Sequence, residues 1–226
     1  MATTRSERSA RLRGLYAITP ERDDDDALVA LVLQAIAGGA KLVQYRAKRL
    51  GAFVRARQAR ALARACRERG VLFIVNDDGK LARDCGADGV HLGATDGDPR
   101  AARAAWPEAI LGVSCYDRPE LARAAAEAGA DYVGIGSLFA SRVKPGAVQA
   151  PLERVGQARA ASGLPVAAIG GINADNAPLA IAAGADMIAV ISALFDAPDV
   201  VQAAQALSRP FDPEDFRHVR TQPAAL

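Results

Sequence analysis

Short apolar segments alternate with helical segments along most of the chain. Each apolar segment is followed by glycine or by polar residues. Strands that are apolar on both faces are typical of parallel sheets covered by helices on both sides. The eight predicted strands are residues 14–18, 41–46, 72–75, 89–92, 110–114, 132–136, 165–169 and 187–191.

The segments between these strands have helical periodicity. Leu28, Leu31, Val32 and Ile36 recur at helical spacing, and a glycine pair then ends the helix. A Gly-Ala pair closes a helix and leads into the next strand four times, beginning at residues 39, 86, 129 and 184. Eight strands that alternate with helices predict an α/β fold of the (β/α)8 TIM-barrel type. A doubly wound sheet is the alternative, but no GxGxxG follows the first strand.

The barrel is predicted to be a single domain over residues 14–207. Residues 1–13 are rich in arginine and serine and lack the apolar centre of a secretory signal, so we expect a disordered N-terminal extension. Residues 208–226 contain several prolines and are predicted to form a C-terminal tail.

The composition is that of a soluble protein and gives no sign of a nucleic-acid-binding or membrane-spanning protein. With 50% hydrophobic and 24% charged residues, the chain has the balance of an ordinary soluble domain, and a net charge of +2 gives no support to nucleic-acid binding. No apolar run approaches the ~18 residues that span a membrane. Cys66, Cys85 and Cys115 form no CxxC pair, so we expect reduced, buried thiols in a cytoplasmic protein.

Polar side chains collect just after the predicted strands. In a barrel, the C-terminal strand ends share one rim, where the active sites of such barrels lie. The polar residues are Gln44, Arg46, Lys48, Asn76, Asp77, Asp96, Ser114, Ser141, Arg142, Lys144 and Ser192. Gly170, Gly171 and Ile191 follow the last two strands and belong to the same rim.

Two of these residues, Asp77 and Asp96, follow neighbouring strands. Because parallel strands joined by a helix end side by side, the two carboxylates are expected to converge. Convergent carboxylates provide the hard oxygen ligands that Mg²⁺ prefers. The alternative is that both residues are helix N-caps, a common role of aspartate after a strand.

The remaining rim residues indicate anion binding. Gly170-Gly171 and Ser192 follow the seventh and eighth strands, where this fold commonly binds phosphate. Arg46, Lys48 and Lys144 could neutralise a diphosphate together with Mg²⁺. Each cation alone could equally be an ordinary surface residue. Ser114 alone could be a helix cap, because no base stands at a spacing that would make it a nucleophile.

His91 lies inside an apolar strand. We expect it to be a structural histidine with satisfied hydrogen bonds rather than a metal ligand.

Taken together, these motifs resemble the thiamine phosphate synthase family, a barrel family that displaces pyrophosphate while joining the two halves of thiamine. The resemblance spans residues 15 to about 207. It is carried by Gln44-Tyr45-Arg46-Ala47-Lys48, Asn76-Asp77, His91-Leu92-Gly93 with Asp96, Gly112-Val113-Ser114, the 136–144 loop, 168–172 and 184–195.

The resemblance implies a Mg²⁺-dependent transferase that binds two small molecules, hydroxymethylpyrimidine diphosphate and a thiazole phosphate. Pyrophosphate would leave first, and the thiazole nitrogen would then attack the pyrimidine methylene cation. Arg46, Lys48, Ser114 and Lys144 would act in catalysis, and Asp77 and Asp96 would hold the metal. The residues implied in substrate binding are Gln44, Tyr45, Arg46, Ala47, Lys48, Asn76, Ser114, Ser141, Arg142, Val143, Lys144, Gly171, Ile191 and Ser192.

The chain departs from the family pattern at several positions. Ala47 stands where the family usually has an acidic residue, Ala94 replaces a glutamine, and Val143 replaces a threonine of the phosphate loop. The related thiazole tautomerases carry a His–Glu pair where this chain has Ser137 and Ala140, which argues against that activity.

Other functions are not excluded by the sequence alone. A phosphosugar-type isomerase would need an acid/base pair on the rim. The altered phosphate loop would also allow a non-catalytic thiazole phosphate binder. The sequence leaves open whether the chain forms a homo-oligomer.

Overall fold

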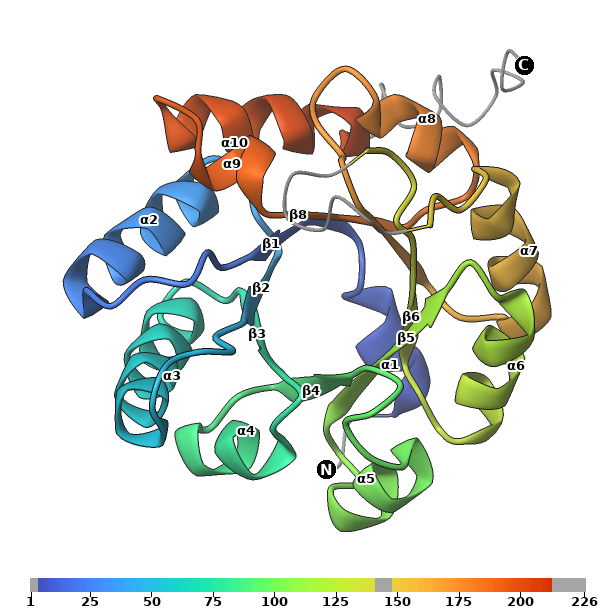
Figure 1. Ribbon diagram of the computed structural model, residues 1–226, viewed down its shortest axis with the longest axis horizontal. Helices are drawn as coiled ribbons and strands as arrows, with labels where there is room; N and C mark the ends of the chain where they lie inside the picture. The colour runs from blue at the N-terminus through green and yellow to red at the C-terminus, as the bar shows by residue number, and fades with distance from the viewer. Residues whose placement is uncertain (1–3, 141–147, 213–226) are drawn as a thin grey trace.

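The protein forms a closed barrel of eight parallel strands in a computed structural model that describes residues 4–140 and 148–212 (Figure 1). The strands follow the order of the sequence, and β1 pairs with both β2 and β8. The predicted (β/α)8 architecture is therefore confirmed. The strands are β1 Gly14–Ile18, β2 Leu42–Tyr45, β3 Leu72–Asn76, β4 Gly89–Leu92, β5 Ile110–Tyr116, β6 Tyr132–Ile135, β7 Val166–Ile169 and β8 Met187–Val190.

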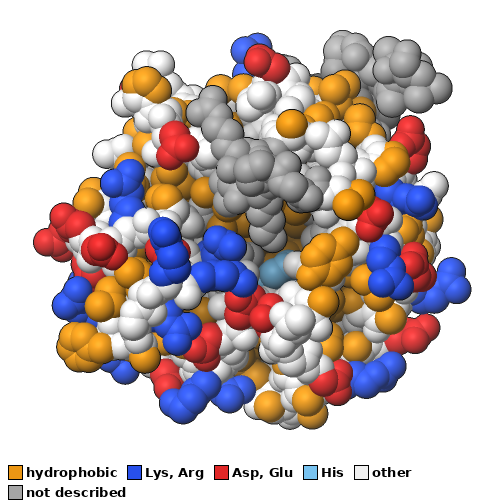
Figure 2. Space-filling view, viewed as in Figure 1, with side chains coloured by type: hydrophobic (Ala, Val, Ile, Leu, Met, Phe, Trp, Pro, Cys, Tyr) orange, Lys and Arg blue, Asp and Glu red, His pale blue; other side chains and the backbone are white. Residues whose placement is uncertain are grey.

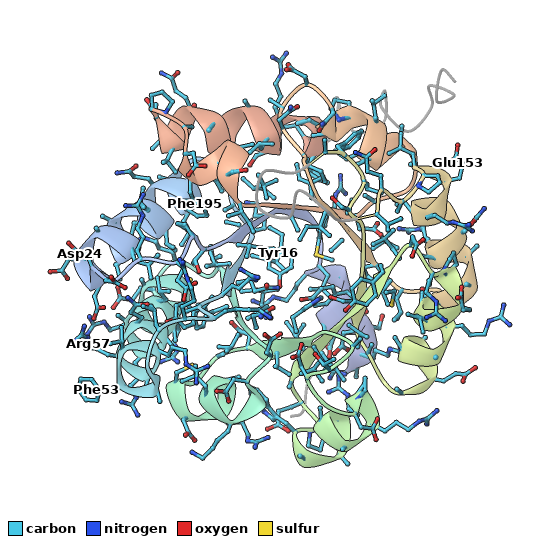
Figure 3. The ribbon with its side chains drawn as sticks, viewed as in Figure 1. Tyr16, Asp24, Phe53, Arg57, Glu153 and Phe195 are labelled. Carbon is cyan, nitrogen blue, oxygen red and sulfur yellow. The ribbon has the colours of Figure 1, made fainter. Side chains whose placement is uncertain are left out.

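The helices surround the barrel as an outer ring, apart from α1 (Figure 1). Figure 3 shows Tyr16 inside the ring of strands, whereas Phe53, Arg57 and Glu153 lie at the periphery. The helices are α1 Arg5–Ala10, α2 Asp25–Ala37, α3 Ala52–Arg67, α4 Gly79–Cys85, α5 Pro99–Ala105, α6 Pro119–Glu127, α7 Glu153–Ser162, α8 Ala177–Ala182, α9 Ser192–Phe195 and α10 Val200–Ser208, followed by the 3₁₀ turn η1 Arg209–Phe211.

Two apolar layers account for the nearly continuous hydrophobicity of the strands. Successive strand residues point to opposite faces, so Tyr16 and Ile18 belong to the cluster inside the barrel. Leu15 and Ala17 belong to the larger cluster between the strands and the helices. Small and branched residues dominate that outer layer, which allows the helices to pack closely on the sheet.

The repeated Gly-Ala-Asp motif has a second structural role at the aspartate. In three places this aspartate makes two hydrogen bonds with one residue of the preceding strand. The aspartate N–H donates to the carbonyl of that residue, and the aspartate carboxylate accepts the N–H of the same residue. Asp88 binds Phe73 in this way, Asp131 binds Leu111 and Asp186 binds Val166. The carboxylate therefore fastens the start of one strand to its neighbour and fixes the register.

The N-terminal segment corrects one expectation from the sequence. Residues 1–13 were expected to be a disordered extension, but residues 5–10 form helix α1 with a capping box at Thr4. Arg8 Nε donates to the fully buried carboxylate of Asp131 over 2.9 Å, and Leu12 is buried inside the barrel cluster. These contacts join residues far apart in the sequence, and local sequence patterns do not reveal them.

The described residues agree with one further expectation, which concerns the cysteines. Cys66, Cys85 and Cys115 are free and buried, and burial raises the pKa of the Cys66 and Cys115 thiols to about 12. None of the helices described here has the length and apolar character needed to cross a membrane.

Candidate active site

A cavity of about 910 Å³ opens at the C-terminal ends of the strands. Acidic and basic side chains lie beside the central hollow on the face seen in Figure 2. Eight of the residues expected at the rim line this cavity, and they come from five different strands or the loops that follow them. They are Gln44, Arg46, Asn76, Ser114, Gly170, Gly171, Ile191 and Ser192.

Asp77 and Asp96 face each other beside the cavity, and neither is a helix cap. The cap of α4 is Asp78, whose carboxylate accepts the Leu81 N–H over 2.8 Å, and the cap of α5 is Asp98. Asp77 instead has a φ of 66°, a conformation that is uncommon outside glycine and occurs at functional sites. The two carboxylates are therefore available for another role.

The electrostatics of this pair suit a cation. Burial raises the pKa of Asp77, and the hydrogen bond with Asp96 raises it further, while Lys48, 3.0 Å away, acts in the opposite direction. Burial also acts to raise the pKa of Asp96, but hydrogen bonds from Asp77 and the Gly93 N–H outweigh it and the pKa falls. The two carboxylates therefore influence each other's pKa in opposite directions.

The donor set fits Mg²⁺ when part of the coordination comes from outside the protein. Two facing carboxylates supply hard oxygen ligands. Among residues 4–140 and 148–212 no cluster of three or more His, Cys, Asp or Glu side chains could bind a metal. The remaining positions would be filled by water and by substrate oxygens, as is usual for Mg²⁺.

The opposite side of the cavity is built from backbone. Gly170 and Gly171 have φ values of 100° and 63°, and a Cβ on Gly171 would lie 2.3 Å from the carbonyl oxygen of Ala140. Only glycine therefore lets this loop pack against the loop after β6. Asn176 fixes the turn by donating from Nδ2 to the Gly171 carbonyl over 3.0 Å. The short helix α9 begins at Ser192, which lines the same cavity.

Comparison with known proteins identifies the family. Residues 15–194 match the family described as thiamine monophosphate synthase. A thiamine-phosphate synthase of Chromobacterium violaceum is 56% identical over 199 residues, covering 88% of this chain and 96% of the relative. One from Aromatoleum aromaticum is 53% identical over 203 residues, covering 89% and 98%. The thiamine phosphate pyrophosphorylase structure from Pyrococcus furiosus is 35% identical with a TM-score of 0.81, covering 92% and 98%.

The chain belongs to the thiamine monophosphate synthase family. It is therefore a transferase of thiamine biosynthesis that acts on small molecules. The resemblance inferred from the sequence is confirmed.

Two residues that the thiamine monophosphate synthase pattern implied in binding do not present side chains to the cavity. Tyr45 follows Gln44 on β2 and therefore points outward, where its hydroxyl donates to Gln58 Oε1 over 2.8 Å. Ala47 packs against the outer apolar layer. Either residue could contact a ligand only through its backbone. Ser141, Arg142, Val143 and Lys144 lie outside the described residues.

The thiamine monophosphate synthase barrel also contains cavity residues that sequence reasoning missed. Tyr16 lines the cavity floor, and buried Tyr132 contacts it through a 2.7 Å hydrogen bond between the two hydroxyls. His91 binds Tyr132 through Nδ1 and Ser114 through Nε2, which confirms that its ring is satisfied. The signal that could have found them is strand alternation, because all three share the inward phase with Gln44 and Ser114.

One departure from the family pattern, at Ala94, lies close to a cavity residue. Ala94, where the family usually has glutamine, offers its backbone N–H to the hydroxyl of Tyr116 over 3.2 Å. Tyr116 lines the cavity and has a φ of 55°. A tyrosine from β5 thus approaches the Ala94 loop.

Proposed function

We propose that the chain joins hydroxymethylpyrimidine diphosphate to a thiazole phosphate, giving thiamine phosphate and pyrophosphate, with both substrates bound in the 910 Å³ cavity. The observation that supports this assignment is a cavity lined by Arg46 and by the Gly170-Gly171 turn, together with the facing carboxylates of Asp77 and Asp96 after the neighbouring strands β3 and β4. Its two sides would bind different phosphate groups. The diphosphate would lie near Asp77 and Lys48, and the thiazole phosphate near Gly171, Ile191 and Ser192.

The leaving pyrophosphate is the group that this chain must stabilise. Arg46 lines the cavity and Lys48 lies 3.0 Å from Asp77, so both can donate charge-assisted hydrogen bonds to diphosphate oxygens. Asp77 and Asp96 would hold Mg²⁺, which supplies positive charge to a departing diphosphate. Lys144, Ser141, Arg142 and Val143 are proposed to complete the phosphate sites by family resemblance.

The pyrimidine ring would lie at the inner end of the cavity. Gln44, Asn76 and Ser114 provide neutral hydrogen-bonding groups there, at the ends of β2, β3 and within β5. Such groups orient a heterocycle without adding charge. The apolar walls from Ile169 and Ala189 exclude water from a reacting methylene carbon.

The related tautomerase activity finds no support in the loop after β6. Ser137 and Ala140 occupy the positions of the acid/base pair in those enzymes, and Ser137 Oγ donates to the Phe139 carbonyl over 3.0 Å. We further propose a cytoplasmic location, which the three free buried cysteines support.

The test is formation of thiamine phosphate by the full chain with Mg²⁺ and both substrates, with one pyrophosphate released for each product. Arg46→Met is expected to lower kcat/KM for the pyrimidine diphosphate by at least about tenfold, because a cation is lost from the cavity. The control is Arg57→Met, since Arg57 lies on the outside of α3 (Figure 3).

Two results would contradict the proposal. Turnover of one substrate without pyrophosphate would indicate an isomerase. Tight calorimetric binding of thiazole phosphate with no product would indicate a non-catalytic binder.

A further inference from the structure

Five side chains from five strands form one continuous hydrogen-bonded chain through the barrel interior. Gln44 Nε2 lies 2.8 Å from the Tyr16 hydroxyl, which lies 2.7 Å from the Tyr132 hydroxyl. Tyr132 lies 3.0 Å from His91 Nδ1, and His91 Nε2 lies 2.8 Å from Ser114 Oγ. Both ends of the chain, Gln44 and Ser114, line the cavity.

The donor at one end determines every donor along the chain. Gln44 Nε2 can only donate, so the Tyr16 oxygen accepts and its single proton is available for Tyr132. Tyr132 then donates to His91 Nδ1, which leaves the ring proton on Nε2. His91 Nε2–H donates to Ser114, whose own proton remains for the cavity.

We propose that this chain is a directional relay in which His91 is a positioning residue: it makes Ser114 a hydrogen-bond donor toward the ligand and leaves the Gln44 carbonyl as an acceptor. His91 acts through Ser114 and does not itself carry out chemistry. Ser114 and Gln44, at the two ends of the relay, thus present one donor and one acceptor to the ring of the bound ligand.

The barrel is shaped to hold the relay. A Cβ on Gly112 would lie 2.1 Å from Tyr132 Cζ and 2.5 Å from His91 Nδ1, so a larger residue would break the link between them. The Tyr16 and Tyr132 rings meet edge to face, with centroids 6.0 Å apart and an interplanar angle of 76°. Tyr16 lies centrally inside the ring of strands (Figure 3).

Burial keeps every member neutral. Desolvation raises the pKa of Tyr16 and of Tyr132, and it lowers the pKa of His91 to about 4. A neutral imidazole can accept at one nitrogen and donate at the other, which a relay requires.

The polarity of the relay selects a substrate class, an inference that rests on the proposed function. A ring nitrogen accepts from Ser114, and an exocyclic amino group donates to Gln44. The aminopyrimidine of thiamine carries both groups. An oxopyrimidine analogue presents the opposite pattern at the exocyclic position and would leave the Gln44 carbonyl facing another acceptor, which is costly in a closed site.

The direct test is the protonation pattern of His91. The chain has two histidines, so a ¹⁵N-histidine-labelled His218→Gln variant gives signals from His91 alone. We expect the proton on Nε2 and a free lone pair on Nδ1 in the substrate-free protein. Gln44→Glu should move the proton to Nδ1, because a carboxylate at position 44 accepts from Tyr16 and reverses every bond. A proton on Nδ1 without this substitution, or an equal mixture, would overturn the relay.

Kinetics provide an independent readout. Tyr132→Phe keeps the ring but removes both hydrogen bonds, and we expect kcat/KM for the pyrimidine diphosphate to fall about three- to tenfold with an unchanged KM for thiazole phosphate. Gln58→Leu is the control, because it removes a buried hydrogen bond on the outer face of β2. Unchanged kinetics in Tyr132→Phe, or equal losses in both variants, would contradict the proposal.

The two measurements separate the relay from the proposed function. If the unsubstituted chain made no thiamine phosphate, the proposed function would fail. The ¹⁵N signals of His91 would still decide the direction of the relay.

Discussion

At the scale of single residues, neighbouring aspartates have different roles. Asp77 and Asp78 are chemically identical and adjacent, yet Asp78 caps α4 while Asp77 turns toward Asp96 and Lys48. The sequence could place a carboxylate at this rim, but it could not distinguish a cap from a ligand. The distinction depends on the backbone at one residue, because the positive φ of Asp77 directs its side chain away from the helix.

His91 leads to a prediction about stability and pH. Burial lowers its folded pKa from 6.5 to about 4, so the unfolded chain binds this proton first as the pH falls. The contribution of neutral His91 to the free energy of unfolding is therefore fully present above pH ~6.5. It is lost as the pH approaches ~4, and the loss amounts to at most about 3 kcal/mol. Urea unfolding of the unsubstituted protein and His91→Asn between pH 7 and pH 4 measures it.

The carboxylates titrate in both proteins and change the free energy of unfolding of each. Their effect therefore cancels when the unsubstituted protein is compared with His91→Asn. We expect the difference in unfolding free energy between the two proteins to shrink as the pH falls. A difference that stays constant across this range would show that His91 is not held neutral by burial.

At the scale of elements, glycine patterns predicted most helix ends correctly, because a left-handed helix stop is a local requirement. Gly86 and Gly129, for example, adopt φ values of 71° and 91° at or just after the ends of α4 and α6. The docking of α1 could not be predicted in the same way. It depends on Arg5 and Arg8 reaching acceptors at residues 126–131, a contact across more than half of the chain.

The role of α1 can be tested by Arg8→Gln. The substitution removes a charge from the buried Asp131 carboxylate, which keeps Arg103 and the Leu111 N–H as partners. We expect a loss of about 1–2 kcal/mol in unfolding free energy, with kcat unchanged because Asp131 lies at the opposite end of β6 from the cavity. Denaturant unfolding together with the thiamine phosphate assay measures both. A fall in kcat at unchanged stability would contradict this structural role.

Strand β5 provides a second test. Gly112→Ala would place a Cβ 2.1 Å from Tyr132 Cζ, so we expect a loss of about 2–3 kcal/mol and a reduced kcat. The matched control is Gly79→Ala at the start of α4, where a Cβ would meet nothing within 4 Å. Thermal unfolding of both variants measures the difference. Equal midpoints would show that the space beside Tyr132 is not tight.

At the scale of the whole molecule, the sequence predicted the closed barrel and the rim on which the site lies, because strand number, alternation with helices and polar strand ends are all visible in one chain. It did not predict the interior chain through Tyr16 and Tyr132. Each tyrosine looks like an ordinary core residue, and only closure of the barrel brings β1 and β6 into contact through side chains.

The central claim is that a cation held by Asp77 and Asp96 assists pyrophosphate departure. The most direct measurement is the initial rate of pyrophosphate release against free Mg²⁺ for the unsubstituted chain, Asp96→Asn and Asp98→Asn. Asp98 is the nearby α5 cap, where asparagine serves equally well. We predict a saturable Mg²⁺ requirement that Asp98→Asn retains, and a rate at least about a hundredfold lower for Asp96→Asn. Full activity in excess chelator, or equal rates for the two variants, would contradict the account.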